Sequence, residues 1–185
     1  MGCVLYIVRH TSTVVEPDIC YGQSDMALSP DFPAAAAAVA AKLQQTDFTR
    51  IYSSPLLRCR TLASFLGGDK TVVEDDRLME LNFGKWEGLS WQSIYDSPKG
   101  KQWFADYLNE SCEGGESFLE LEARVSDFID SLGEEQGNIL IITHAGVIRA
   151  AARLFGAADV DGCFALQLPF GCVAKVGEKG EFDIL

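Results

Sequence analysis

The sequence predicts an α/β fold, specifically a three-layer α/β/α sandwich with a mostly parallel central sheet. Two runs, Cys3 to Val8 and Asn138 to Thr143, are nearly continuous in apolar residues, as is typical of strands buried on both faces of a parallel sheet. Segments rich in helix formers alternate with such runs, which indicates βαβ units. The 185 residues are 48% hydrophobic and 23% charged, so we expect one globular domain over residues 1–185.

The first half of the chain alternates between helix and strand signals. Ser29 and Pro30 predict the N-cap and first turn of an alanine-rich helix, and Gly67-Gly68 predicts the end of another helix. The elements expected here are a helix from Ala34 to Leu43, a strand from Arg50 to Ser53, a helix from Leu56 to Leu66 and a strand from Thr71 to Glu74.

The pattern loosens between residues 75 and 115, where short helical pieces carry three Trp and several Gly. We interpret this stretch as a helical insertion beside the sheet, in which Trp86 and Trp91 serve as packing residues. Ser117 and Glu120 then match a capping box that opens an amphipathic helix. The remaining elements expected are that helix to about Leu132, a helix from Val147 to Phe155, and closing strands over Phe164 to Leu168, Val173 to Val176 and Phe182 to Leu185.

Composition and charge exclude several classes of function. A formal net charge of −12 argues against a nucleic-acid partner, because binding to a phosphate backbone needs clustered Lys and Arg. No apolar run approaches the roughly 18 residues of a membrane span, so no membrane partner is expected. The six Cys show no paired spacing, and the N-terminal residues do not resemble a secretory signal. We therefore expect a cytoplasmic protein with reduced thiols.

Two histidines stand at equivalent positions in the predicted sheet. His10 follows the apolar run that ends at Val8, and His144 follows the apolar run that ends at Ile142. In open α/β sheets, ligands bind beyond the carboxyl ends of the strands. A lone histidine there is more often a strand cap or a core residue, but two in matching positions favour a shared site.

Arginines near the same strand ends indicate that the ligand of this site is an anion. Arg9 adjoins His10, and Arg58 follows the strand that ends near Ser53. Each could instead form an ordinary surface ion pair. Together they favour phosphate, because the guanidinium fork matches phosphate oxygens and stays charged. The free N–H groups of the helix that begins at Ala145 would add donors.

Glu80 is the candidate proton donor for chemistry at this site. It lies just beyond the third predicted strand and could reach the same edge of the sheet, although a loop carboxylate paired with a nearby cation explains it equally well. A Gly-x-Ser-x-Gly elbow, a Walker A loop, a Gly-x-Gly-x-x-Gly fingerprint and zinc-ligand spacings are all absent from the sequence. We therefore expect catalysis without a metal ion or cofactor.

Several motifs in order resemble those of the histidine phosphatase (phosphoglycerate mutase-like) superfamily across nearly the whole chain. They are Val8-Arg9-His10-Thr11-Ser12-Thr13, the run from Ser53 to Ala63, Glu80 to Gly88, Gly115-Glu116-Ser117, and Thr143 to Arg149. The resemblance implies that His10 is the nucleophile, that Arg9, Arg58 and His144 bind the phosphoryl group, and that Glu80 is the general acid. Thr11 and Ser12 replace the Gly and the acidic or amide residue that are usual after the first histidine of the family.

The segment Cys20-Tyr-Gly-Gln-Ser-Asp25 is similar to that of the α-ribazole phosphatases within this superfamily. This similarity implies a phosphomonoesterase that removes the 5′-phosphate of α-ribazole in cobalamin nucleotide-loop assembly. Beyond Arg9, Arg58 and His144, the residues expected to contact the substrate are Thr13, Tyr21, Gly22, Gln23 and Ala145.

Other functions remain open at this point. A broad-specificity sugar-phosphate or phosphoglycerate phosphatase or mutase of the same family would share the site, and an inactive module that binds a phosphorylated ligand would share the fold. The only partner expected is a small-molecule phosphomonoester. The sequence does not decide the oligomeric state, and a homodimer is one arrangement compatible with it.

Overall fold

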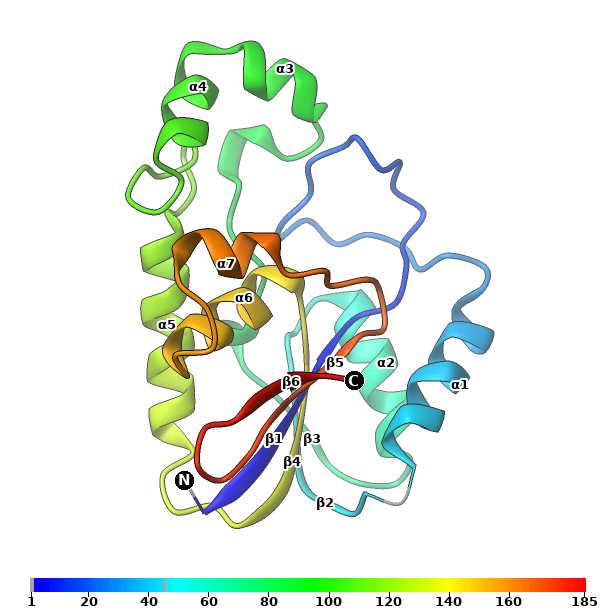
Figure 1. Ribbon diagram of the computed structural model, residues 1–185. Helices are drawn as coiled ribbons and strands as arrows, with labels where there is room; N and C mark the ends of the chain where they lie inside the picture. Colours follow the sequence, from blue (N-terminus) through cyan, green and yellow to red (C-terminus); the bar gives the residue numbers. More distant parts are fainter. Residues whose placement is uncertain (1, 45) are drawn as a thin grey trace.

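One mixed β-sheet runs through the centre of the computed structural model, which describes residues 2–44 and 46–185 (Figure 1). Met1 and Gln45 of the expected 1–185 domain lie outside the described residues. The strands in chain order are β1 (Cys3–Arg9), β2 (Phe48–Ser53), β3 (Val72–Glu74), β4 (Gly137–Thr143), β5 (Val173–Val176) and β6 (Phe182–Ile184). They are arranged β3-β2-β4-β1-β5-β6. The first four are parallel to one another, β5 pairs antiparallel with β1, and β6 pairs antiparallel with β5. The predicted mostly parallel sheet is confirmed.

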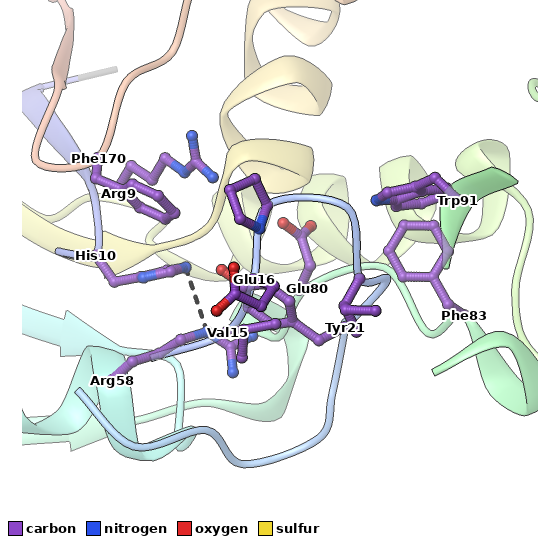
Figure 2. Close-up of a pocket in the computed structure, with 12 residues that line it drawn as sticks. Arg9, His10, Val15, Glu16, Tyr21, Arg58, Glu80, Phe83, Trp91 and Phe170 are labelled. Carbon is purple, nitrogen blue, oxygen red and sulfur yellow. Dashed lines mark hydrogen bonds between the residues drawn. The ribbon is translucent and has the colours of Figure 1, made fainter. Parts of the chain in front are cut away.

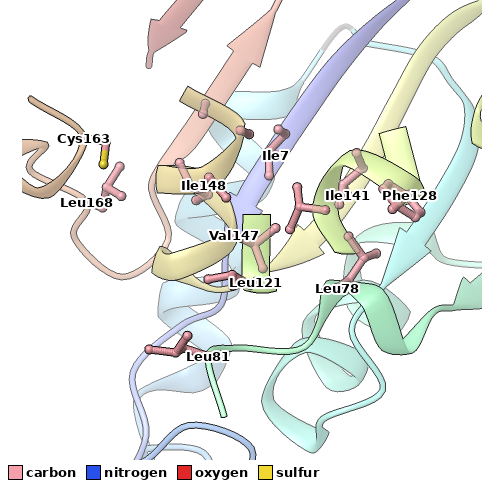
Figure 3. Close-up of a cluster of buried hydrophobic side chains, with 14 of the residues drawn as sticks. Ile7, Leu78, Leu81, Leu121, Phe128, Ile141, Val147, Ile148, Cys163 and Leu168 are labelled. Atoms are coloured by element: carbon pink, nitrogen blue, oxygen red, sulfur yellow. The ribbon is translucent and has the colours of Figure 1, made fainter. Parts of the chain in front are cut away.

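Helices cover both faces of this sheet, as expected for three layers. Buried residues of α1 (Phe32–Leu43) and α2 (Leu57–Gly67) pack on one face in one apolar cluster. A larger cluster joins the other face to α5 (Phe118–Ser131), α6 (Ala145–Leu154) and α7 (Val160–Ala165). Figure 3 shows part of it, where Ile7 and Ile141 of the sheet meet Leu121, Val147 and Ile148. Burying these side chains contributes roughly 1.5–3 kcal/mol each.

The pairing of β1 with β4 brings the two predicted histidines together. The strands are parallel and in register, with Val8 opposite Ile142 and Arg9 opposite Thr143. The residue that follows each final pair is a histidine, His10 on one strand and His144 on the other. The two imidazoles therefore leave the sheet side by side, with ring centroids 5.1 Å apart.

The insertion predicted at about 75–115 stands beyond the carboxyl ends of the parallel strands (Figure 1). It contains two 3₁₀ turns, η1 (Asp76–Leu78) and η2 (Gly84–Trp86), and two short helices, α3 (Trp91–Asp96) and α4 (Pro98–Ala105). Trp86 is buried and meets the Trp103 ring edge-on, with centroids 5.7 Å apart. Trp86 is therefore a packing residue, as predicted.

Two local predictions are wrong. Residues 164–168, expected as a strand, begin inside α7 and continue as extended chain that pairs with no strand of the described sheet. The Asp159 carboxylate caps α7 by accepting a hydrogen bond from the Gly162 N–H, so the local cap outweighs the alternating apolar pattern. Ser29 is not the N-cap of α1, because Asp31 occupies that position and Pro33 provides the first-turn proline. The capping box of Ser117 and Glu120 is confirmed.

Two further features are the character of the helices and the state of the cysteines. Within the described residues, no helix combines the length and apolar character needed to cross a membrane. All six cysteines are buried and none is part of a disulfide.

Candidate active site

A pocket of about 370 Å³ opens at the carboxyl end of β1, between the loop of residues 13–28 and the insertion (Figure 2). Its lining combines a few charged groups with many apolar ones, which is the usual composition of a small-molecule site. The lining residues are Arg9, His10, Val15, Glu16, Pro17, Ile19, Tyr21, Arg58, Glu80, Phe83, Trp91 and Phe170. Four of the five predicted catalytic residues are among them.

His10 lies at the base of the pocket with one ring nitrogen unprotonated. Its Nδ1 lies 2.7 Å from the carbonyl oxygen of Thr11, so Nδ1 carries the proton and donates it to that oxygen. The other nitrogen, Nε2, accepts a hydrogen bond from the Nε–H of Arg58 at 3.2 Å. A lone pair on Nε2 therefore faces the cationic side of the pocket.

Both histidines are held in the neutral form. Burial, together with the neighbouring charges of Arg58 and Arg9, lowers the pKa of His10 to about 3, against a hydrogen bond to Thr11 that raises it. Burial also places the pKa of His144 well below its usual value, with His10 and Arg58 acting in the same direction. A neutral imidazole is the form that can attack an electrophile.

This neutrality predicts that the protein loses stability as the pH falls from 7 to 5. A histidine in the unfolded chain has a pKa of about 6.5, so below that pH His10 binds a proton in the unfolded state but not in the folded state. For a folded pKa of about 3, His10 alone should cost about 2 kcal/mol of unfolding free energy between pH 7 and pH 5. Urea titrations at both pH values measure the loss.

The His10→Gln variant provides the matched comparison for this pH dependence. It should lose about 2 kcal/mol less than the wild type between the two pH values, because its unfolded state no longer takes up that proton. Carboxyl groups titrate mainly below pH 5 and contribute little in this window. An identical pH dependence in both proteins would show that His10 is not held neutral.

Arg58 is a fully buried cation whose described contacts include no carboxylate. Its guanidinium donates to the carbonyl oxygens of Ser24 and Gly22, and it lies 5.3 Å from the centre of the Tyr21 ring. None of the ion pairs among the described residues includes it. Burying a charge without a counter-charge costs free energy, so this arrangement favours the binding of an anionic ligand.

Arg9 supplies a second cation to the same pocket. Its guanidinium lies 4.0 Å from the centre of the Phe170 ring and donates to the carbonyl oxygen of Leu168. Its Nε is buried and has no hydrogen-bond partner within the described structure. Phe170 also lies beside His10, with ring centroids 5.5 Å apart, so one aromatic ring orients both residues.

Glu80 enters the pocket from the insertion and lies at the N-terminus of α6. Its Oε1 accepts hydrogen bonds from the backbone N–H groups of Leu81, at 2.9 Å, and Gly146, at 3.1 Å. A Cβ atom at Gly146 would lie 2.2 Å from that oxygen, so only glycine allows this approach. The backbone N–H of Gly146, one of the helix N–H groups expected to help bind the anion, therefore binds Glu80 in the free protein.

His144 lies behind His10 and not on the pocket wall. It is fully buried, and its Nε2 lies 2.8 Å from the hydroxyl oxygen of Ser54 and 3.4 Å from the thiol of Cys59. The predicted direct contact of His144 with the phosphoryl group is therefore not visible in the free site. Ala145 likewise does not line the pocket; it opens α6 beside Glu80.

The loop residues expected to contact substrate occupy different places. Tyr21 lines the pocket and accepts a hydrogen bond from the Thr13 hydroxyl at 3.3 Å. Gly22 lies against the insertion, where a Cβ atom would be 2.1 Å from the Leu81 carbonyl oxygen. The side-chain amide of Gln23 donates to the carbonyl oxygen of Glu80 at 3.0 Å. Gly22 and Gln23 thus position Arg58 and Glu80.

Residues that the sequence did not single out hold this frame together. The Glu87 carboxylate accepts hydrogen bonds from the backbone N–H groups of Gln23, at 2.9 Å, and Ser24, at 2.7 Å. Burial raises the pKa of Glu87, but these bonds and one from the Ser24 hydroxyl lower it below its usual value overall. Arg124 donates to the carbonyl oxygen of Glu80 at 2.9 Å and pairs with Glu116. The one sequence signal for this positioning role was that Glu87 lies inside the Glu80 to Gly88 motif.

Aromatic side chains form the outer wall of the pocket. Phe83 and Trp91 meet edge-on with ring centroids 5.3 Å apart, and both line the cavity (Figure 2). Trp91, predicted to be a packing residue, therefore also faces the ligand space. Among the described residues, no group of three or more His, Cys, Asp or Glu side chains is arranged to hold a metal ion.

Comparison with known proteins agrees with this geometry. Residues 5–182 match the model of the histidine phosphatase superfamily (branch 1). Phosphoserine phosphatase 1 of Hydrogenobacter thermophilus is 28% identical over 79% of this chain and 72% of its own length. The probable phosphoglycerate mutase GpmB of Escherichia coli O1:K1 is 30% identical over 77% of this chain and 69% of its own length.

A solved structure shares the whole architecture. The crystal structure of the α-ribazole phosphatase from Shigella flexneri superimposes with a TM-score of 0.86 at 25% sequence identity, covering 98% of this chain and 94% of that one. Similarity therefore extends over the sheet, both helical layers and the insertion, while the named activities of the relatives differ.

Proposed function

The chain belongs to branch 1 of the histidine phosphatase superfamily, and on that basis we propose that it hydrolyses phosphomonoesters through a phosphohistidine intermediate on His10. The observation that carries this proposal is the pairing of Arg58 with His10. A fully buried guanidinium with no carboxylate partner lies 3.2 Å from a neutral imidazole nitrogen. A phosphoryl group placed there supplies the missing negative charge and an electrophile for that nitrogen.

In the first step, His10 Nε2 attacks phosphorus in line with the ester oxygen. The N–P bond forms as the P–O bond to the leaving alcohol breaks, and the proton of protonated Glu80 passes to the leaving oxygen. Arg9 and Arg58 hold the equatorial oxygens and balance their charge. His144 would join them from behind His10 once the site is occupied.

In the second step, water attacks the phosphorus of phosphohistidine. The Glu80 carboxylate accepts a proton from this water, the N–P bond breaks, and neutral His10 and inorganic phosphate are regenerated. Glu80 thus returns to its protonated form. This cycle balances without a metal ion or a cofactor, and we propose that none takes part.

The Glu80→Gln variant should separate substrates by their leaving groups. Glutamine can keep the hydrogen bond from Gly146 but cannot donate the proton, so hydrolysis of glycerol 3-phosphate should slow by roughly 10²–10⁴-fold. p-Nitrophenyl phosphate releases a stable phenolate and should slow by less than about tenfold. Steady-state rates with both esters measure this contrast.

A matched control for this variant is Glu113→Gln, which changes an exposed glutamate of the same insertion paired with Lys85 at 3.0 Å. It should leave both rates unchanged. If Glu80→Gln slowed the two esters equally, Glu80 would act through structure or charge and not as the proton donor.

The substrate that the pocket supports best is α-ribazole 5′-phosphate. Tyr21, Phe83 and Trp91 offer aromatic surfaces to a nucleoside, and stacking of this kind is worth about 1–3 kcal/mol per base in other proteins. The likeness to the Shigella flexneri α-ribazole phosphatase and the segment from Cys20 to Asp25 support the same choice. Gln23 and Thr13 would contribute by fixing Glu80 and Tyr21.

Phosphate release from a panel of esters tests this assignment. The panel holds α-ribazole 5′-phosphate, 3-phosphoglycerate, simple sugar phosphates and p-nitrophenyl phosphate, assayed in EDTA. A strong preference for the ribazole ester supports the cobalamin role. A flat, weak profile would retain a general phosphatase and remove that role.

Two other activities were compatible with the sequence. The names of relatives such as the probable phosphoglycerate mutase of Escherichia coli keep a sugar-phosphate or phosphoglycerate phosphatase or mutase as the second candidate. A mutase must hold a second anionic group, yet Arg9 and Arg58 are the only Arg or Lys among the described residues that line the pocket. An inactive phosphate-binding module is disfavoured because His10, Arg58 and Glu80 meet in one pocket.

We further propose that the enzyme acts in the cytoplasm on a small-molecule phosphomonoester, without nucleic-acid or membrane partners. Six buried cysteines outside any disulfide suit a reducing compartment, and a net charge of −12 disfavours anionic polymers. A homodimer remains the assembly to be tested, by light scattering at micromolar protein concentration.

A further inference from the structure

Glu16 places a second carboxylate in the wall of the pocket, apart from Glu80. It is an exposed residue of the 13–28 loop, and it lines the same cavity as His10 and Arg58 (Figure 2). None of the hydrogen bonds or ion pairs that lock this loop to the insertion uses the Glu16 side chain within the described structure. Its charge is therefore available to a ligand.

The backbone of this loop is nevertheless well fixed. Ile19 forms a β-bridge with Ser90, and the carbonyl oxygen of Asp18 accepts a hydrogen bond from the Trp91 N–H at 2.8 Å. The Glu16 N–H and carbonyl lie at the start of a tight turn, since the Ile19 N–H donates to the Glu16 carbonyl at 3.1 Å. The Glu16 carboxylate is thus presented from a defined position on the rim.

The charges of the pocket are unevenly distributed. Both cations, Arg9 and Arg58, contact or flank His10, where the phosphoryl group must sit. The remainder of the lining is apolar apart from Tyr21 and the two carboxylates, Glu16 and Glu80. Once the phosphoryl group has engaged both arginines, and Glu80 carries the proton for the leaving oxygen, the charge that remains for the rest of the leaving group is the negative charge of Glu16.

We infer that Glu16 is a specificity-determining residue that rejects leaving groups bearing a second negative charge. This inference rests on the proposed phosphatase function and narrows its substrate class to monoesters of uncharged or cationic alcohols. A carboxylate on the leaving group would be repelled by Glu16, whereas a hydroxyl or ammonium group could donate a hydrogen bond to it. Because Glu16 is exposed, the effect should weaken as salt rises.

A matched pair of substrates isolates this effect. Glycerol 3-phosphate and 3-phosphoglycerate differ only in carrying a hydroxymethyl group or a carboxylate at the far carbon. In 20 mM buffer, Glu16→Gln should raise kcat/KM for 3-phosphoglycerate relative to glycerol 3-phosphate by about three- to tenfold, as expected for removing one like charge at a partly solvated site. Glu16→Lys should raise this ratio further, and 0.5 M NaCl should reduce both effects.

Asp18→Asn is the control, because it removes the same charge two residues away on the same loop from a residue that does not line the pocket. It should leave the ratio unchanged. A ratio that is unaffected by Glu16→Gln, or moved equally by Asp18→Asn, would overturn the inference.

Binding measurements keep this test separate from the proposed catalytic function. Dissociation constants of both esters are measured by calorimetry in the His10→Ala background, with and without Glu16→Gln. The same three- to tenfold change in relative affinity is expected, about the size of one screened like-charge contact. If the wild type hydrolysed no phosphomonoester, α-ribazole 5′-phosphate and p-nitrophenyl phosphate included, but this affinity ratio shifted, the proposed phosphatase function would fail while the selectivity of Glu16 stood. An unshifted affinity ratio would overturn the selectivity.

Discussion

Replacing His10 by alanine is expected to lower kcat for p-nitrophenyl phosphate by at least about 10⁴-fold, since removing a covalent nucleophile costs several orders of magnitude. No other imidazole can substitute for it, because His144 is fully buried behind His10. The rate is measured as nitrophenolate release at pH 7 in EDTA. Rapid-quench labelling of the wild type with a ³²P-labelled ester should trap one acid-labile phosphate per active chain, which the variant should not form.

The His10→Gln variant controls for the space left by alanine. It should be equally inactive, and inorganic phosphate should still raise the melting temperature of both variants because Arg9 and Arg58 remain. Turnover within tenfold of the wild type in either variant would refute the phosphohistidine mechanism. A variant that is inactive because it is unfolded would be recognised by its circular dichroism spectrum.

Arg58→Met is expected to lower kcat/KM by roughly 10²–10³-fold, the usual cost of removing a charged group aimed at transition-state oxygens in a closed site. Methionine fills part of the volume without a charge. The free energy of unfolding without ligand should change by less than about 2 kcal/mol, since the lost hydrogen bonds to Gly22 and Ser24 are offset by removal of an uncompensated buried cation.

Phosphate binding distinguishes this role of Arg58 from a structural one. In 10 mM inorganic phosphate the wild type should melt several degrees higher, because a ligand that binds only the folded state stabilises it, and Arg58→Met should lose most of that shift. Arg77→Met is the matched control, since Arg77 pairs with Asp75 at 2.6 Å outside the pocket. Equal losses in both variants would contradict an anion site at Arg58.

The sequence allowed the centre of the sheet to be predicted because β1 and β4 are mostly apolar runs. Most β4 residues and four of the seven β1 residues are buried, and the branched side chains of these runs distinguish them from the alanine-rich run of α1. The order of the strands could not be predicted, because pairing depends on how the crossover helices pack. The strand predicted at residues 164–168 was wrong for a related reason. Alternating apolar residues indicate that one side of the chain is buried, and a segment that pairs with no strand can bury one side as well.

The residues of the candidate site could be predicted where reactive or charged side chains directly follow the ends of predicted strands. Arg9, His10, Arg58 and Glu80 line one pocket, as expected. The parts that escaped prediction are contacts between distant loops, such as Glu87 with Gln23 and Phe170 with Arg9. Such contacts leave no local spacing signal, since their partners are separated by more than 60 residues in the sequence.

Thr11, which departs from the family motif, has a simple structural account. Its carbonyl oxygen accepts the His10 Nδ1 proton, a task for which any residue type suffices. Its hydroxyl is buried without a hydrogen-bond partner within the described structure, so the side chain fills space beside the nucleophile. Ser12 bonds instead to Asp31 at 3.1 Å, away from the pocket.

The register of β1 and β4 has a consequence for how such enzymes diversify. Because paired backbone strands set the spacing of His10 and His144, the reacting centre does not depend on the composition of the surrounding loops. The 13–28 loop and the 75–115 insertion can therefore accumulate substitutions that alter substrate choice while His10, the proposed nucleophile, stays in place. The different activities for which the relatives are named, on phosphoserine, phosphoglycerate and α-ribazole phosphate, are the outcome expected when selection acts on those two segments of one inherited scaffold.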